Sequence, residues 1–264
     1  MLNKIRKTLA RDPLATTERF CAVSQILSVL ESFPSAERKK GGINDWEYTK
    51  FLYGTDDVFT DPDKRERHVR LLLGTRLASA LTLLLPTSNN TRMVASALSG
   101  LTYAAGNKYT INGSDGAEQY AAIILTSSAL GRTNGGKNKD LAIAFIAAQT
   151  TLSYFVAGIV KSLGYEWKRG TAVERVIRTE SYGNEPFYKF LRAHPTLSTL
   201  LTRSTVIIET AFPALILCKK TRPLAFISMF AFHAANIELM GLGRFFLVFT
   251  STYPAVARAI RPLV

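Results

Sequence analysis

The chain alternates between apolar windows, typically about 16 to 22 residues long, and polar segments. A helix rises about 1.5 Å per residue, so such a window approaches the length needed to cross a hydrocarbon layer of about 30 Å. We therefore predict an all-α fold, a polytopic transmembrane helical bundle with about seven membrane windows. The windows are residues 17–33, 68–85, 93–106, 117–131, 141–161, 199–218 and 223–250.

The polar segments set the expected organisation of the bundle. Two of them are long, residues 35–67 and 162–196, and we expect them to lie outside the membrane. The last window is long for one crossing, and Gly241 and Gly243 are expected to break it. We see no internal repeat, and we expect residues 1–264 to form a single transmembrane domain.

The charge distribution favours a lipid bilayer as the partner over nucleic acid. The net charge is +13 and the pI about 9.9, and the basic runs at 38–40, 64–70 and 219–222 lie beside apolar windows. If the N-terminus lies inside the cell, the short basic loops 132–139 and 219–222 also face the cytoplasm. No removable signal peptide is expected at the N-terminus.

Cysteines and histidines do not predict a metal centre. Cys21 and Cys218 are the two cysteines, and both are expected to pack inside apolar windows. His68, His194 and His233 are far apart in sequence, so we predict no metal site.

Lys161 is the first candidate for chemistry, because ionisable residues in membrane helices tend to find partners and to be functional. On a helix, Tyr154, Gly158 and Lys161 share one face, and the glycine allows a neighbouring helix or a flat ligand to approach the lysine. Two interpretations remain open. The lysine either extends its ammonium group to the membrane interface or is a desolvated base that accepts a proton near neutral pH.

Three further polar residues fall inside apolar windows. Glu209 requires protonation or a partner, either Arg203 or a group on a neighbouring helix, and a proton-handling role is equally open. His233 and Asn236 lie one helical turn apart. They either join two helices by hydrogen bonds or line a ligand pocket.

Two ordered motifs carry a family resemblance. Residues 154–161 read YFVAGIVK and are followed by WKRG at 167–170; residues 232–239 read FHAANIEL and are followed by Gly243 and Phe245. This pattern resembles the membrane core of the vitamin K-dependent γ-glutamyl carboxylases and their bacterial relatives, the horizontally transferred transmembrane (HTTM) domain family. The resemblance implies a bacterial cytoplasmic membrane protein.

The resemblance also implies a chemistry. In the carboxylases the lysine that matches Lys161 deprotonates reduced vitamin K, so the implied cofactor is a reduced quinone of the vitamin K or menaquinol type. A secreted peptide is the implied substrate. The implied pocket consists of Tyr154, Gly158, Trp167, Glu209, His233, Asn236 and Asp115. At 111–115 this chain reads INGSD, where the carboxylases have a histidine, and Asp115 is the candidate substitute. A protein carboxylase in the narrow sense is therefore not expected.

Three functions remain open at this point. The first is a carboxylase-like lyase or quinol-oxidising membrane enzyme with Lys161 as its base. The second is a non-enzymatic membrane protein for maturation, export or immunity of a secreted peptide. The third is a transporter with Glu209, Lys161 and His233 as its relay.

Overall fold

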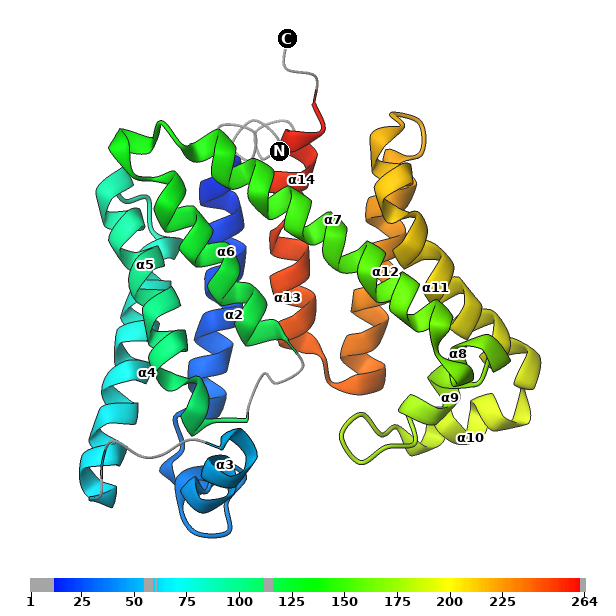
Figure 1. Cartoon of the computed structure of the whole chain (residues 1–264), viewed down its shortest axis with the longest axis horizontal. Helices are drawn as coiled ribbons and strands as arrows, with labels where there is room; N and C mark the ends of the chain where they lie inside the picture. The colour runs from blue at the N-terminus through cyan, green and yellow to red at the C-terminus, as the bar shows by residue number, and fades with distance from the viewer. Residues whose placement is uncertain (1–11, 55–58, 60, 112–115, 262–264) are drawn as a thin grey trace. The chain divides into compact units, whose positions relative to one another are not determined.

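The computed structural model describes residues 12–54, 59, 61–111 and 116–261. All regular secondary structure among these residues is helical, which confirms the predicted all-α class (Figure 1). The chain forms two compact units, one of Met1–Ile146 with Leu247–Ala259 and one of Ala147–Phe246 with Ile260–Val264. The single transmembrane domain expected from the sequence stays a prediction.

The first unit is built on four long helices. These are α2 (Pro13–Ser32), α4 (Pro62–Leu84), α5 (Asn89–Gly106) and α6 (Ala117–Gly131). Helix α2 packs on α4 and α6, and α5 packs between α4 and α6. Asp12, Asp61 and Ser88 begin three of these helices by accepting hydrogen bonds from backbone N–H groups of the first turn. The unit also holds η1 (Ser35–Arg38), α3 (Trp46–Tyr53), η2 (Asn107–Tyr109), η3 (Asn134–Gly136) and α14 (Tyr253–Ala259).

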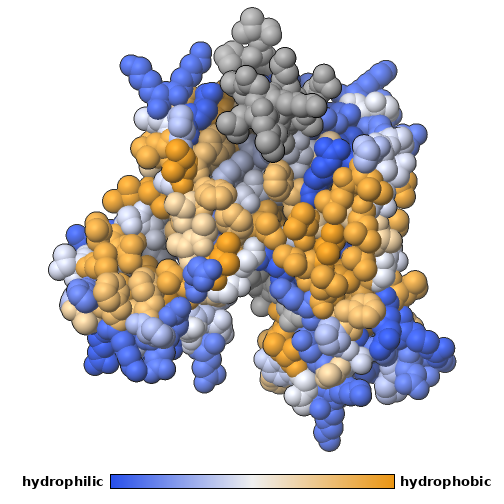
Figure 2. All heavy atoms as spheres, turned by 180° about the vertical axis from the view of Figure 1, so that it is seen from behind, coloured by the Kyte–Doolittle hydropathy of each residue, from blue (hydrophilic) through white to orange (hydrophobic). Residues whose placement is uncertain are grey.

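The buried face of helix α2 is rich in polar residues, and its exposed face is largely apolar. Glu18, Ser24 and Gln25 are almost completely buried, whereas Leu27 and Leu30 are 39% and 58% exposed. A helix of a water-soluble bundle has the opposite arrangement. On the face drawn in Figure 2, apolar side chains form broad patches.

A buried ion network holds three helices of this unit together. The carboxylate of Glu18 accepts hydrogen bonds from Arg92 on α5 at 2.5 Å and from Arg132 at 2.5 and 2.9 Å. Ser128 on α6 donates a further hydrogen bond to the same carboxylate. Both guanidinium groups also donate to uncharged acceptors. Arg92 donates to the backbone carbonyl oxygens of residues 15, 83 and 85, and Arg132 donates to the side-chain oxygen of Asn89. The two arginines are therefore compensated although they are buried.

The second unit is built on α11 (Pro195–Leu217), which contacts α8 (Tyr165–Arg169), α9 (Ala172–Val176), α10 (Glu185–Ala193) and α12 (Arg222–Met240). Helix α7 (Lys139–Leu163) begins in the first unit and ends in the second, and α13 (Gly243–Ser251) also belongs to both. In the turn between α11 and α12, Arg222 donates to the carbonyl oxygens of Ile216 at 2.9 Å and Ile260 at 3.2 Å. This arginine caps the end of α11 with positive charge.

Each predicted window coincides with a helix, but the membrane assignment is confirmed only in part. Three helices, α7, α11 and α12, have the length and composition of a membrane span among the described residues. The window 223–250 is broken as predicted, because α12 ends at Met240 and Gly241 adopts a φ of +70° before α13 begins. Cys21 is buried as expected, whereas Cys218 is exposed because it lies just past the end of α11.

Candidate functional site

Lys161 and Glu209 form an ion pair between two of the candidate membrane helices. Lys161 lies in the last turn of α7, and its Nζ is 2.9 Å from Oε1 and 2.7 Å from Oε2 of Glu209 on α11. The Glu209 side chain is 5% exposed and that of Lys161 is 26% exposed. Lys161, rather than Arg203, is therefore the partner of Glu209. One end of the pair is buried and the other is accessible from outside the helix bundle.

Trp167 covers part of this ion pair. Lys161 Nζ lies 5.6 Å from the centre of the indole ring, within the range of a cation–π contact. Gly164, which separates α7 from α8, leaves room for this arrangement, since a Cβ there would lie 2.9 Å from Cδ1 of Trp167. The motif spacing from Lys161 to Trp167 thus brings a flat aromatic face next to the ammonium group.

Gly158 sets the distance between α7 and α11. A Cβ at this position would lie 2.3 Å from Oγ1 and 2.6 Å from the backbone nitrogen of Thr210. Contacts that short do not occur between real side chains, so only glycine permits this approach. Of the two partners that the sequence left open at this glycine, a neighbouring helix or a flat ligand, the structure has the helix α11 here. Its approach places Lys161, nearly one turn further along α7, beside Glu209.

Tyr154 and His233 form a second, fully buried contact between α7 and α12. The Tyr154 hydroxyl lies 2.8 Å from Nε2 of His233, and the two residues are 2% and 1% exposed. Phe212 packs edge-on against the Tyr154 ring at 4.7 Å, and Phe245 lies 5.5 Å from the His233 ring. The hydrogen bond joins two helices, as one interpretation of His233 predicted.

The structure does not gather every candidate residue. Asn236 is half-buried one turn beyond His233, and its carbonyl accepts a hydrogen bond from the backbone N–H of Leu242 at the end of α12. Asp115 lies outside the described residues. Lys161, Trp167 and Glu209 therefore form one cluster, and Tyr154 with His233 forms another. Helix α7 contributes one residue to each cluster, Lys161 to the first and Tyr154 to the second.

Sequence reasoning did not predict a third cluster of charged residues. Arg76 on α4 donates to Glu118 on α6 at 2.7 Å, and both residues line a cavity in the first unit. The sequence did contain an indication of this pair, because Arg76 falls inside the window 68–85 and Glu118 falls at the start of the window 117–131. Their pairing depends on how α2 and α5 hold α4 and α6 in place, which no local pattern reveals.

Comparison with known proteins gives one positive result. Residues 138–258 match the family model of the HTTM domain, and this segment contains both sequence motifs, the Lys161–Glu209 pair and the Tyr154–His233 contact. No curated protein matches the chain. No solved structure matches it either. The family resemblance carried by the two motifs is confirmed, because both motifs lie within residues 138–258, which match the HTTM domain.

Proposed function

We propose that the chain is an integral membrane enzyme in which Lys161 accepts a hydroxyl proton from a reduced quinone, with Glu209 as the partner of the lysine. The observation that carries this proposal is the ion pair itself. Two charged residues lie on helices with the composition of membrane spans, and a charge at the centre of such a helix costs about 2.5 to 3.5 kcal/mol on insertion scales. Glu209 lies inside α11, whereas Lys161 lies in the last turn of α7. Ionisable residues inside membrane helices tend to mark functional sites, so the ion pair supports a role in the chemistry of the protein.

Glu209 allows the lysine to exchange protons without leaving a lone buried charge. In the resting pair the ammonium group faces the carboxylate at 2.7 Å. When the proton moves to Glu209, a neutral amine and a neutral carboxylic acid remain, and Lys161 Nζ can then accept the hydroxyl proton of the substrate. The ammonium group is restored and Glu209 keeps the displaced proton, so the total charge balances.

The surroundings of Lys161 fit a flat, lipid-soluble substrate. The lysine is partly accessible, the Trp167 ring offers an aromatic face beside Nζ, and Val156 and Val160 on α7 are exposed apolar side chains. An aromatic ring with a prenyl tail needs such a combination of a stacking surface and an apolar, lipid-facing wall. Oxygen is the co-reactant implied by the resemblance to the carboxylases, and a secreted peptide is the implied acceptor.

The decisive experiment measures turnover of reduced menaquinone and reduced vitamin K by the purified full chain in detergent, with and without oxygen. We expect Lys161→Met to reduce turnover by about 10²-fold or more, the usual contribution of a general base. Glu209→Gln should also reduce it. Lys168→Met is the matched control, because this exposed lysine lies on α8 and makes no contact with Glu209 in the structure.

Each alternative function has its own outcome. Absence of turnover by well-folded native protein with every quinol would refute the enzyme proposal and favour a role in maturation, export or immunity of a secreted peptide. Proton-coupled solute uptake into proteoliposomes, lost in Glu209→Gln without any quinol oxidation, would favour a transporter.

We also propose that α2, α4, α5 and α6 cross the membrane. The support is the inverted polarity of the first unit, with paired charges inside and exposed leucines outside, such as Leu27 on α2 and Leu98 on α5. Spin labels at Leu27→Cys and Leu98→Cys should collide with dissolved oxygen more often than with a water-soluble nickel chelate. Preferential collision with the nickel chelate would place these helices in water.

A further inference from the structure

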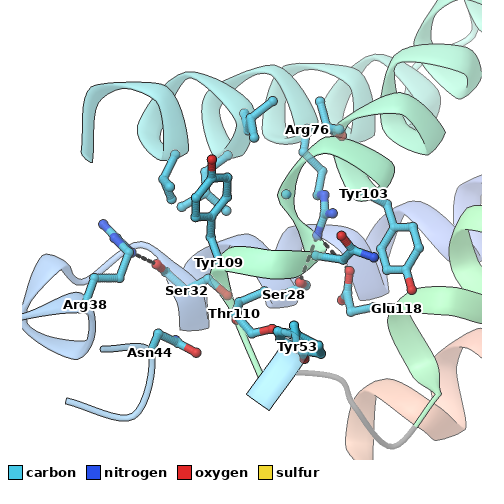
Figure 3. Close-up of a pocket in the computed structure, with 16 residues that line it drawn as sticks. Ser28, Ser32, Arg38, Asn44, Tyr53, Arg76, Tyr103, Tyr109, Thr110 and Glu118 are labelled. Atoms are coloured by element: carbon cyan, nitrogen blue, oxygen red, sulfur yellow. Dashed lines mark hydrogen bonds and ion pairs between the residues drawn. The ribbon is translucent and has the colours of Figure 1, made fainter. Parts of the chain in front are cut away.

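A cavity lined by polar and apolar side chains lies in the first unit, and none of its lining residues belongs to the two HTTM motifs. Its volume is about 80 Å³, and its lining comes from α2, α4, α5 and α6 together with the chain around α3 and η2. Figure 3 shows Arg76, Ser28 and Glu118 gathered at one side and Arg38 with Ser32 at another. At about 10 to 15 Å³ for each water-sized atom, the cavity has room for about five to eight such atoms.

Arg76 presents hydrogen-bond donors that no described residue uses. The residue is 8% exposed, and both of its hydrogen bonds come from Nη1, to Glu118 at 2.7 Å and to Ser28 at 3.4 Å. A guanidinium group has five N–H donors in a fixed fork. The donors on Nε and Nη2 therefore remain for a group inside the cavity.

Tyr109 adds a second polar group to the wall. Its ring is 5% exposed and is held by Trp46 at 5.5 Å and His68 at 5.8 Å. Within the described part of the chain, its hydroxyl has no hydrogen-bond partner. Val69 and Leu73 complete the wall with apolar surface. The cavity thus combines hydrogen-bonding groups with a short apolar stretch.

The charged residues of the cavity favour a ligand with an uncharged hydrogen-bond acceptor. The charge of Arg76 is already offset by Glu118, and a carboxylate placed against Arg76 would lie near that second carboxylate. A neutral carbonyl oxygen can use the remaining N–H donors without this repulsion. The volume also excludes a two-ring quinone. The side-chain amide of asparagine or glutamine has the right size and a carbonyl acceptor.

The cavity adjoins a larger outer cleft of about 560 Å³. Arg38, Asn44, Val69 and Tyr109 line both spaces. The outer cleft has the volume of an ordinary ligand site, about 300 to 1,000 Å³. Its lining carries both signs of charge: Lys39, Lys40, Arg65, Arg70, Asp45, Glu47, Asp63 and Glu66. A peptide has backbone amides and side chains of either charge, so its chemistry matches this lining.

We propose that the cavity and the outer cleft form one binding site for a peptide segment, with an asparagine or glutamine side chain inserted against Arg76. The peptide backbone and its charged side chains occupy the outer cleft. This site requires neither Lys161 nor a quinol, so it goes beyond the proposed reaction and is tested by binding alone.

The test uses the purified full chain in detergent and fluorescein-labelled heptapeptides with flanking lysine and glutamate residues. The central residue is glutamine, glutamate or leucine, and binding is measured by fluorescence anisotropy. We expect the glutamine peptide to bind about tenfold more tightly than the other two. Leucine leaves the buried donors of Arg76 unsatisfied, and glutamate places a second carboxylate near Glu118. Free N-acetylglutamine amide should compete only at much higher concentration.

Arg76→Lys tests the assigned contact, because lysine keeps the ion pair with Glu118 and loses the planar fork of donors. We expect this variant to bind all three peptides alike. Arg203→Lys, an exposed position on α11, is the matched control and should keep the preference for glutamine. If Arg76→Lys does not fold, Tyr109→Phe should reduce the preference several-fold.

Three results would overturn the proposal. Equal affinity of the native chain for the three peptides would mean that the cavity holds water only. Tightest binding of the glutamate peptide would show recognition of charge rather than of an amide. Competition by the free amide at the same concentration as the peptide would show a small-molecule site instead.

Discussion

Gly158 offers the most direct test of the packing that joins α7 to α11. In Gly158→Ala, the new Cβ would lie 2.6 Å from the backbone nitrogen of Thr210, which must retreat by about 0.4 Å to reach the 3.0 Å limit of real Cβ contacts. The Thr210 hydroxyl, at 2.3 Å, can rotate away, but the backbone cannot. Overpacking of this kind costs about 1 to 3 kcal/mol.

Alanine has a higher helix propensity than glycine, and this gain offsets part of the packing cost. A second glycine-to-alanine variant, at a helical position without a clash, is therefore needed as a control. Gly74 lies within α4 and has nothing within 4 Å of its added Cβ. We expect Gly74→Ala to stabilise the protein by about 1 kcal/mol, the propensity difference alone. The two variants should therefore differ by about 1 to 3 kcal/mol, with Gly158→Ala the less stable.

Thermal unfolding in detergent, followed by tryptophan fluorescence, measures this difference. For a chain of this size, about 1 kcal/mol corresponds to about 2 to 4 °C in Tm, so the two variants should be separated by about 2 to 12 °C. Adding Thr210→Ala to Gly158→Ala should recover only part of the loss, because the backbone contact remains. Equal increases in Tm for Gly158→Ala and Gly74→Ala would refute the close approach of the two helices.

Three further predictions concern polar contacts. Tyr154→Phe should destabilise the protein by about 1 to 3 kcal/mol, because the buried Nε2 of His233 loses the hydroxyl 2.8 Å away. Glu18→Gln should cost about 3 to 5 kcal/mol, because two buried arginines lose their carboxylate. The Arg38 guanidinium lowers the pKa of Glu66 from 4.5 to about 2. The contribution of the Glu66 carboxylate to stability is therefore complete above pH 4.5 and is lost as the pH falls through about 2. Glu66→Gln should abolish this part of the pH dependence.

Thermal unfolding checks the first two variants at neutral pH, and a series from pH 5 to pH 2 checks the third. A Tyr154→Phe variant with native Tm would contradict a structural role for the hydroxyl. Native stability of Glu18→Gln would mean that the ion network is absent from the folded protein. If Glu66→Gln and the native chain lose stability in parallel on acidification, the Arg38–Glu66 contact does not lower the pKa.

The sequence was sufficient to predict the helices of the apolar windows and the two motif blocks. The short helices α3, α8, α9 and α10 were not predicted, because they lie in the two long polar segments. Apolar windows coincide with helices, as expected for segments that cross a membrane, where the backbone must satisfy its hydrogen bonds internally. The break at Gly241 was predictable because a positive φ is accessible to glycine at little cost. The face shared by Tyr154 and Gly158 was also predictable, since it depends only on the helical period.

The partners of the charged residues were not predictable. Glu209 pairs with Lys161, 48 residues away, and Glu18 binds Arg132, 114 residues away. Such pairs depend on which helices are neighbours, and helical periodicity contains no information on that choice. The inner cavity escaped prediction for the same reason, because its lining is contributed by several helices.

The long separation of Glu18 from its partners has a consequence for biosynthesis. Helix α2 leaves the ribosome before Arg92 and Arg132, which follow Glu18 by 74 and 114 residues. At about 5 to 20 residues per second, the second arginine arrives about 6 to 23 s after the glutamate. During this interval the carboxylate has neither partner. If α2 crosses the membrane as proposed, its stable insertion must wait for α5 and α6, so the first unit enters the bilayer as a group of helices rather than one helix at a time.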